Sequence, residues 1–205
     1  MSMNDLSIKA FAEELAAKTS VPGGGGAAAL AGALAAALGS MVGVFTVGKA
    51  KYAAVEPEIL ALMDKAEELR KQLLDCIDED AVGFEPLSKA YGIPKDEPGR
   101  DETLEKCLHD AAAVPMKILI LSCQVIDLQE EFAAKGSTLM ISDAGCGAVL
   151  AWAAMYAAAL NVRVNTKLMK DRAYAEDLNK QVEAHMDFYW KKADAVYESV
   201  YERLK

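Results

Sequence analysis

The chain has 205 residues and a mass of 22.0 kDa, which suits one folded domain over residues 1–205 and excludes a large multidomain assembly. Its 22 Lys and Arg residues against 31 Asp and Glu residues give a formal net charge of −9, and no stretch concentrates basic residues, so nucleic acid is not expected as a partner. With 53% hydrophobic and 26% charged residues, the composition is that of a globular protein and not of a disordered one.

Helical periodicity with capping residues recurs along the chain, whereas strand-like alternation does not, so the sequence predicts an all-α fold. Asp5 is expected to cap a first helix whose Phe11 and Leu15 face inward. Residues 19–26 should break this helix, and a second helix is expected from about residue 27 to residue 47. Glycine and alanine recur on one face of that second helix, which predicts close packing against a partner helix.

A long charged third helix is expected to follow, with Pro57 in its first turn, a kink at Pro86 and an end at Gly92. Residues 101–136 then form a helical segment that Pro115 interrupts, which gives either two helices or one kinked helix.

Ser142 or Asp143 is expected to cap an Ala-rich helix that continues past Asn165, and a last amphipathic helix should cover residues 173–204. The predicted architecture is therefore a single bundle of six to eight helices whose central, Ala- and Gly-rich members are buried.

Two uncharged runs are long enough to cross a bilayer, residues 21–48 and residues 144–162. The first contains eight Gly and eight Ala and opens with a glycine loop, and the second is mostly Ala without aromatic belts at its ends. A helix that is apolar on all sides can also be the buried centre of a bundle. We therefore expect no membrane insertion.

The four cysteines are widely spaced and no secretory segment is recognised, which predicts a cytoplasmic protein with reduced thiols. The only histidines, His109 and His185, lie outside the patterns that bind zinc, and both are expected on helix surfaces. No metal site is expected. Any chemistry should therefore use carboxylates, amides and backbone groups.

The glycine loop is the first candidate site, because Pro22, Gly23, Gly24, Gly25 and Gly26 run directly into a helix. Free N–H groups at that helix start could hold a carboxylate or a carbonyl oxygen. The loop lacks the Gly-Lys-Ser/Thr of a P-loop, and no strand precedes it. A tight turn where two backbones touch is the alternative explanation.

On the third helix, Asp80 lies at the edge of the apolar stripe, whereas Asp78 and Glu79 point away from it. Desolvation would raise the pKa of Asp80 and make it a candidate base, unless a nearby Lys or Arg pairs with it.

Asn161 and Asn165 are four residues apart, so they can act on one ligand edge or satisfy broken backbone at a helix end. Asp143 precedes Asn161 by 18 residues, roughly 27 Å along a straight helix. Either the ligand is long, the helix bends, or one of these two residues serves the fold.

Several stretches of this sequence form a recognisable set in chain order. They are Thr19 to Leu34, Met41, Lys49, Tyr52, Asp80-Ala81-x-x-Phe84, Val114-Pro115, Ser142-Asp143 and Asn161-Val162-x-x-Asn165. Together they closely resemble the cyclodeaminase/cyclohydrolase family of folate enzymes, over about residues 5 to 170. An extra glycine in the loop and the proline at position 86 depart from the family pattern.

This resemblance implies an all-helical homodimer that acts on a tetrahydrofolate derivative and needs no further cofactor. Family members either hydrolyse 5,10-methenyltetrahydrofolate to the 10-formyl form or eliminate ammonia from 5-formiminotetrahydrofolate. The second activity is often fused to a formiminotransferase domain, for which 205 residues leave no room. A cyclohydrolase is the leading expectation, a cyclodeaminase the alternative, and a non-catalytic helical scaffold a third hypothesis.

The methenyl bridge is a delocalised cation, so water can attack its carbon without a metal if a carboxylate stabilises the charge and accepts a proton. Asp80 is the expected base, with Asp143 as the second candidate. Asn161 or Asn165 would bind the pterin edge or the departing nitrogen.

For the rest of the substrate, the amides of residues 23–26 would suit a carbonyl group or the tail carboxylate and would repel the cation. Lys49 could meet the glutamate tail, although a solvated lysine is the alternative.

Overall fold

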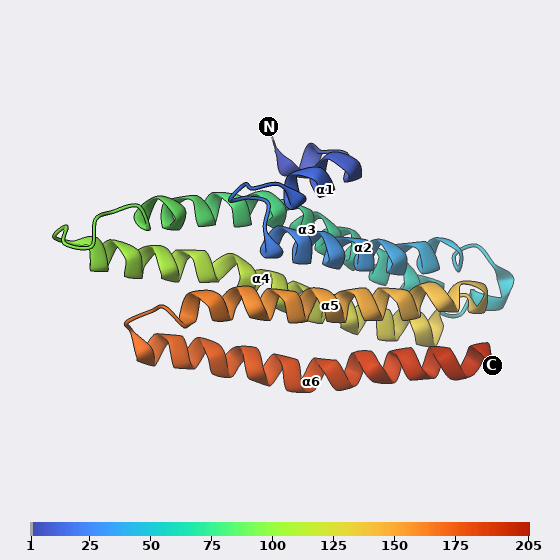
Figure 1. The fold of residues 1–205 in the computed structure, drawn as a ribbon. Coiled ribbons are helices and arrows are strands. Elements are labelled where there is room, and N and C mark those ends of the chain that lie inside the picture. The colour runs from blue at the N-terminus through green and yellow to red at the C-terminus, as the bar shows by residue number, and fades with distance from the viewer. Residues whose placement is uncertain (1) are drawn as a thin grey trace.

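The computed structural model describes residues 2–205, which form an all-α bundle as the sequence predicts (Figure 1). The helices of this described part are α1 (Ile8–Ala16), α2 (Gly24–Val44), α3 (Glu56–Ala90), α4 (Arg100–Lys135), α5 (Ile141–Thr166) and α6 (Arg172–Leu204). Three single 3-10 turns, η1 (Met3–Asp5), η2 (Ala50–Tyr52) and η3 (Thr138–Met140), connect or precede them.

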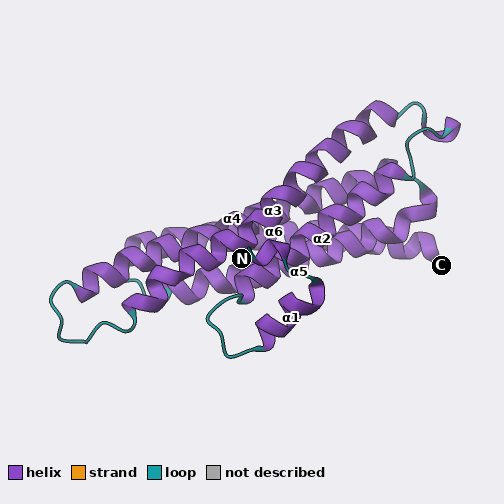
Figure 2. Ribbon diagram, turned by 90° about the horizontal axis from the view of Figure 1, so that it is seen from above, coloured by secondary structure: helices purple, strands orange, loops and turns teal. Residues whose placement is uncertain are grey.

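Helix α4 packs against α2, α3, α5 and α6 and forms the back of the bundle. The other long helices follow one another around it, because α2 contacts both α3 and α5, and α5 contacts α6. Figure 1 shows that α2 and α5 lie side by side and are antiparallel. Figure 2, from above, shows α1 standing apart from this bundle near the start of α2.

Small residues let α2 and α5 come close to α4, which confirms the predicted buried centre. A Cβ atom at Gly39 of α2 would lie 2.8 Å from Phe132 Cε2 and 2.9 Å from Gln129 Nε2. A Cβ at Gly147 of α5 would lie 2.5 Å from Gln129 Cδ. Gln129 itself is buried and donates its Nε2 hydrogen to Ala35 O at 2.7 Å. Interdigitation at this density leaves no room for added atoms.

The N-terminal helices differ from the prediction in their bounds and packing. Ser7, and not Asp5, caps α1, by accepting a hydrogen bond from the backbone N–H of Ala10 at 3.1 Å. Phe11 is buried as expected, but Leu15 remains 40% exposed, because α1 covers little of the bundle. Helix α2 starts inside the glycine run, at Gly24, and ends at residue 44. Tertiary packing thus overrides the low helix propensity of glycine there.

The later helices decide whether the segment around Pro115 is one helix or two, and they differ from the prediction at the N-cap of α5. Residues 100–135 form one continuous helix with Pro115 inside it, not two helices. Helix α5 begins at Ile141, so neither Ser142 nor Asp143 caps it. Asp171 caps α6 by accepting from the backbone N–H of Tyr174 at 3.0 Å.

By length and composition alone, three described segments could cross a membrane: Gly24–Val44, Arg100–Lys135 and Thr138–Thr166. Their most apolar windows have mean hydropathies of 1.9, 1.7 and 1.5, and between 50% and 67% of each window is buried inside the bundle. Burial of this extent accounts for much of their apolar character as bundle packing.

The close approach at Gly39 predicts a loss of stability when a methyl group is added. Gly39→Ala should lower the free energy of unfolding by about 1–3 kcal/mol, because Phe132 and Gln129 are buried and have little space to yield. Urea unfolding followed by circular dichroism measures the change. Gly83→Ala on α3 is the matched control, since its Cβ would lie 3.7 Å from Val114 Cγ2, and it should raise stability through helix propensity. A Gly39→Ala protein as stable as the wild type would contradict this account of the packing.

Candidate functional site

A pocket of about 210 Å³ opens where the start of α2 meets the C-terminal third of α3, the N-terminal half of α4 and the end of α5. Figure 1 shows the beginning of α2 lying between α3 and α5. The residues that line the pocket are Ser20, Val21, Gly23, Gly24, Gly25, Asp80, Phe84, Ala111, Pro115, Asn161, Val164 and Asn165. Four separate segments of the chain therefore build one concave site.

Asp80 supplies the carboxylate of this pocket. Its side chain is half-buried, and desolvation raises the pKa of the carboxyl above the ordinary value of 3.8, while a hydrogen bond from the backbone N–H of Gly26 opposes the rise. A Cβ at Gly25 would lie 2.5 Å from Asp80 Cγ, so only glycine lets the start of α2 come this close. The partner of Asp80 is thus a helix N-terminus and not the lysine or arginine that was the alternative.

The two acids that precede Asp80 have structural partners. Asp78 Oδ1 accepts a hydrogen bond from the backbone N–H of Met3 at 2.7 Å and so holds the N-terminal turn against α3. Glu79 Oε2 lies 2.8 Å from Lys117 Nζ and links α3 to α4. Neither Asp78 nor Glu79 lines the pocket. Asp80 is therefore the acid that α3 presents to a ligand.

Asn161 and Asn165 both line the pocket, and both use their Nδ2 groups for the fold. Asn161 Nδ2 donates to Ala157 O at 2.8 Å, and the Asn161 amide would lie 3.0 Å from a Cβ at Gly24. Asn165 Nδ2 donates to Asn161 O at 2.9 Å and to Ala111 O at 3.2 Å. The side-chain oxygens are the atoms that these asparagines retain for a ligand.

Pro115 explains why Asn165 is needed at this place. A proline has no N–H, so the carbonyl of Ala111, four residues earlier on α4, has lost its helical donor. Asn165 Nδ2 replaces that donor. Ala111 and Val164 are pocket residues that our sequence reasoning missed. A proline inside a predicted helix marks a free carbonyl four residues before it, and this signal could have identified Ala111.

Of the glycine loop, Gly23, Gly24 and Gly25 line the pocket, whereas Pro22 and Gly26 do not. Gly26 still contributes through its N–H, which is directed to Asp80. Pro22 is buried and lies 3.6 Å from the position of a Cβ at Gly26. The loop thus serves both as a close backbone contact and as part of the site.

Asp143 and Lys49, which were also candidate site residues, do not line this pocket within one chain. Helix α2 has 21 residues and is about 30 Å long, and Lys49 follows its far end. Helix α5 is continuous from Ile141 to Thr166, so Asp143 lies roughly 27 Å from Asn161, at the same far end. Lys49 Nζ lies 3.4 Å from Ser137 Oγ there.

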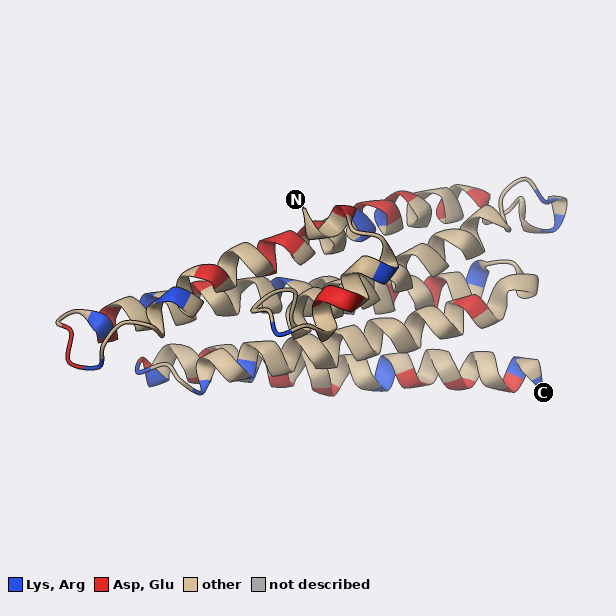
Figure 3. Cartoon of the chain, turned by 45° about the horizontal axis from the view of Figure 1, so that its top comes forward, with Lys and Arg blue, Asp and Glu red and all other residues tan. Residues whose placement is uncertain are grey.

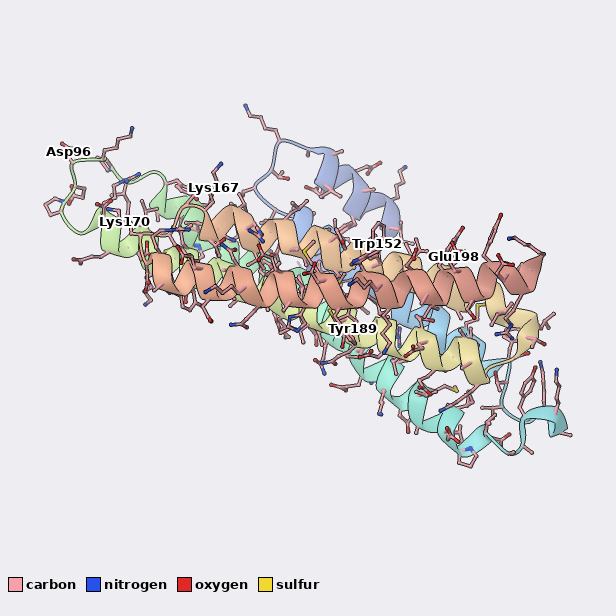
Figure 4. The ribbon with its side chains drawn as sticks, turned by 90° about the horizontal axis from the view of Figure 1, so that it is seen from below. Asp96, Trp152, Lys167, Lys170, Tyr189 and Glu198 are labelled. Carbon is pink, nitrogen blue, oxygen red and sulfur yellow. The ribbon has the colours of Figure 1, made fainter. Side chains whose placement is uncertain are left out.

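Wider depressions also lie on the described surface. One of about 410 Å³ adjoins the pocket through Ser20 and Val21, and two are separate from it. Of these two, one of about 410 Å³ between α5 and α6 is lined mainly by Trp152, Trp190 and Tyr197 with neighbouring apolar atoms. Figure 4 labels Trp152 of α5 beside α6, whereas Tyr189 of α6 contacts α4 through a hydrogen bond from its hydroxyl to Asp127 Oδ2 at 3.0 Å. The other, of about 620 Å³, is a groove of mixed charge between α3 and α4. Neither contains any candidate residue, so their size alone does not make them the site.

Comparison with known proteins is consistent with this arrangement. A model of the formiminotransferase-cyclodeaminase family matches residues 7–184. The methenyltetrahydrofolate cyclohydrolase of Methylorubrum extorquens is 40% identical over 97% of this chain and 95% of its own length. The formimidoyltransferase-cyclodeaminase of Rattus norvegicus is 32% identical over 88% of this chain, and the matched region spans 34% of that longer protein.

A solved structure leads to the same conclusion. The formiminotetrahydrofolate cyclodeaminase of Thermotoga maritima superposes with a TM-score of 0.82 at 31% identity, covering 98% of this chain and 96% of that one. Because the family model covers most of the chain and the relatives match nearly its whole length, this chain belongs to the formiminotransferase-cyclodeaminase family.

Proposed function

We propose that this chain is a methenyltetrahydrofolate cyclohydrolase, which hydrolyses 5,10-methenyltetrahydrofolate to 10-formyltetrahydrofolate. The observation that carries the proposal is a pocket whose polar side chains offer acceptors, the Asp80 carboxylate and the oxygens of Asn161 and Asn165. Such a lining suits a cation that also presents N–H groups. The similarity to the Methylorubrum extorquens cyclohydrolase over almost the whole chain supports the same activity.

The reaction begins when a water oxygen attacks the carbon between N5 and N10. The electron pair of the C=N bond moves to nitrogen, and the Asp80 carboxylate takes one proton from the water. The C–N5 bond then breaks as Asp80 returns that proton to N5. The second proton, from the new hydroxyl, passes to solvent as the formyl C=O forms. Half-burial of Asp80 strengthens its attraction for the cationic bridge, because less water screens the two charges.

The asparagines hold the substrate in this scheme. The oxygens of Asn161 and Asn165 accept hydrogen bonds from the pterin N–H groups, and Phe84 and Val164 supply apolar contact for its rings. Since Asn165 is anchored on Ala111 O, its oxygen is held in one position before substrate arrives. We propose that the protein works in the cytoplasm as a homodimer, with no cofactor beyond the folate itself.

A second candidate is formiminotetrahydrofolate cyclodeaminase, which the Thermotoga maritima relative favours. Here a ring nitrogen attacks the formimino carbon and ammonia leaves, so the same carboxylate would manage protons at the same carbon. Ammonia release from 5-formiminotetrahydrofolate separates the two activities. A non-catalytic scaffold is the third candidate, and it predicts that neither substrate is turned over and that Asp80→Asn changes only stability.

The first prediction concerns Asp80 directly. Purified protein should remove the absorbance of the methenyl substrate faster than buffer does, and Asp80→Asn should lower kcat on the order of 100-fold or more. The amide keeps an oxygen for the Gly26 N–H, so circular dichroism and thermal unfolding should show an intact fold. Asp78→Asn is the matched control and should retain the catalytic rate. An Asp80→Asn protein with full activity would show that Asp80 is not the base, whereas wild-type protein that acts on neither folate substrate would leave only the scaffold.

The second prediction is a pH dependence with opposite signs for rate and stability. As pH falls through the raised pKa of Asp80, the base becomes protonated, so kcat should fall at a higher pH than for an ordinary aspartate. The folded state binds this proton more tightly than the unfolded state. The stability that Asp80 contributes is therefore greatest below its unfolded pKa and decreases as pH rises through the folded value. Rate and unfolding profiles of wild type and Asp80→Asn test both, and identical profiles would refute the role.

The third prediction concerns assembly. Sedimentation equilibrium should give a mass twice that of the 22.0 kDa chain. A mass of 22.0 kDa at micromolar concentration would rule out the proposed homodimer.

A further inference from the structure

The pocket is incomplete for the substrate proposed above, and this inference rests on that proposed function. The substrate is a cation at its bridge but carries a glutamate tail with two carboxylates. Among the described residues, those that line the pocket include no lysine, arginine or histidine. The volume of about 210 Å³ is also below the range of about 300–1,000 Å³ typical of ligand sites. An adjoining depression of about 410 Å³ shares Ser20 and Val21 with the pocket and contains Lys89. Lys89 Nζ already pairs with Glu85 Oε1 at 2.6 Å, so we look outside this chain for the cation that meets the tail.

Lys49 is a cation without an evident task in its own chain. It is exposed just beyond the end of α2, with its Nζ 3.4 Å from Ser137 Oγ and 6.0 Å from the centre of the Phe45 ring. These contacts are weak at such distances, so the ammonium group remains available. The length of α2, about 30 Å, keeps it out of the pocket of its own subunit.

Lys49 lies at one edge of an uncharged surface on the outer side of α2 and α5, which we call the α2/α5 face. Its exposed members include Leu34 and Met41 of α2, Phe45 directly after α2, and Cys146, Ala153 and Leu160 of α5. Leu34 is 48% exposed and Leu160 is 72% exposed. Figure 3 shows that the acidic and basic residues are distributed instead along helices such as α3 and α6.

The two ends of the α2/α5 face carry groups of complementary charge. The pocket lies at one end, beside the start of α2 and the end of α5, and Lys49 lies at the other. Leu34 is ten residues from both Gly24 and Val44, so it marks the middle of α2, about 15 Å from either end. A two-fold axis through this middle would exchange the two ends between two copies.

We propose that the α2/α5 face binds a second copy of this chain in antiparallel orientation, so that Lys49 of the partner subunit reaches the pocket and binds the substrate's carboxylate tail. Each dimer then contains two composite sites. Asp80 and the asparagines of one subunit hold the cationic end, and the lysine of the other holds the anionic end. One subunit thus binds the positive bridge of the substrate, and the other subunit binds its negative tail.

The face has the size and charge that a second copy requires. Helices α2 and α5 have 21 and 26 residues and run side by side over about 30 Å. At a spacing of 8–10 Å this stretch presents a projected area of about 600 Å², of the order of the about 800 Å² per partner of a stable complex. Chains with a net charge of −9 repel one another, and contact through an uncharged face keeps most of these charges apart. Helix α1, which stands off from the bundle near the start of α2 with Ile8 80% exposed, is free to contact the same partner (Figure 2).

Subunit complementation tests this arrangement. Lys49→Ala alone should raise KM for the glutamate-bearing substrate about tenfold with little change in kcat, and should leave KM unchanged for the same substrate lacking the tail. In a purified heterodimer of Asp80→Asn and Lys49→Ala chains, one site contains both wild-type groups. That site should show the wild-type KM, with about half the wild-type kcat per dimer. If each site used one chain only, the heterodimer would show only the raised KM. Lys71→Ala, an exposed lysine on α3, is the matched control.

A cross-linking experiment makes the test independent of catalysis. Ser20 lines the pocket, so Ser20→Cys with Lys49→Cys, in a Cys146→Ser background, should give a covalent dimer with a short bis-maleimide. Lys49→Cys alone should not. The remaining cysteines are buried. A dimer that fails to cross-link in this way would overturn the proposal, as would a monomer that binds phospholipid vesicles through the α2/α5 face. Cross-linking of a protein that lacks cyclohydrolase activity would refute the proposed reaction but would still support the proposed antiparallel dimer.

Discussion

The approach of the α2 backbone to the carboxylate of Asp80 is the contact on which the pocket depends. It requires a residue without a side chain at Gly25 and a free N–H at Gly26, and the first turn of a helix supplies both. The hydrogen bond holds a half-buried charge that would otherwise be costly to desolvate. A fixed carboxylate follows from this one contact, and so does the position of the glycine loop beside Asn161, whereas it is burial that raises the pKa of Asp80.

A second contact between helices, from Asn165 of α5 to Ala111 of α4, fixes the opposite wall of the pocket. Pro115 removes an N–H from α4, the carbonyl of Ala111 is left without its helical donor, and Asn165 provides the replacement from α5. In both places, an irregularity in one helix is completed by a polar group of another. The residues that face the ligand are therefore also residues that join helices, which makes the site rigid at the cost of leaving few of its atoms free for other roles.

The groups suited to the cationic and anionic parts of the substrate lie at opposite ends of the bundle. The pocket has acceptor oxygens that favour a cation, whereas Lys49 lies about 30 Å away, past the far end of α2. A substrate with a cationic bridge and an anionic tail requires both kinds of group within its own length. An antiparallel pair of subunits meets this requirement, since the uncharged surface between the two ends can then be covered by its own copy.

The sequence by itself determined the all-α fold, the approximate extents of α3 and α6, and the placing of Asp80 on the inner edge of its helix, because periodicity, prolines and caps are local signals. It left open whether residues 101–136 form one helix or two, and the structure shows one helix through Pro115. It could not show that α2 begins within the glycine run, since packing against Asp80 outweighs local propensity there. It also could not show that Ala111 belongs to the pocket, or that Asp143 and Lys49 lie at the other end of the bundle. These placements depend on which helices pack together and in which direction, and only the tertiary contacts among α2, α4 and α5 decide that.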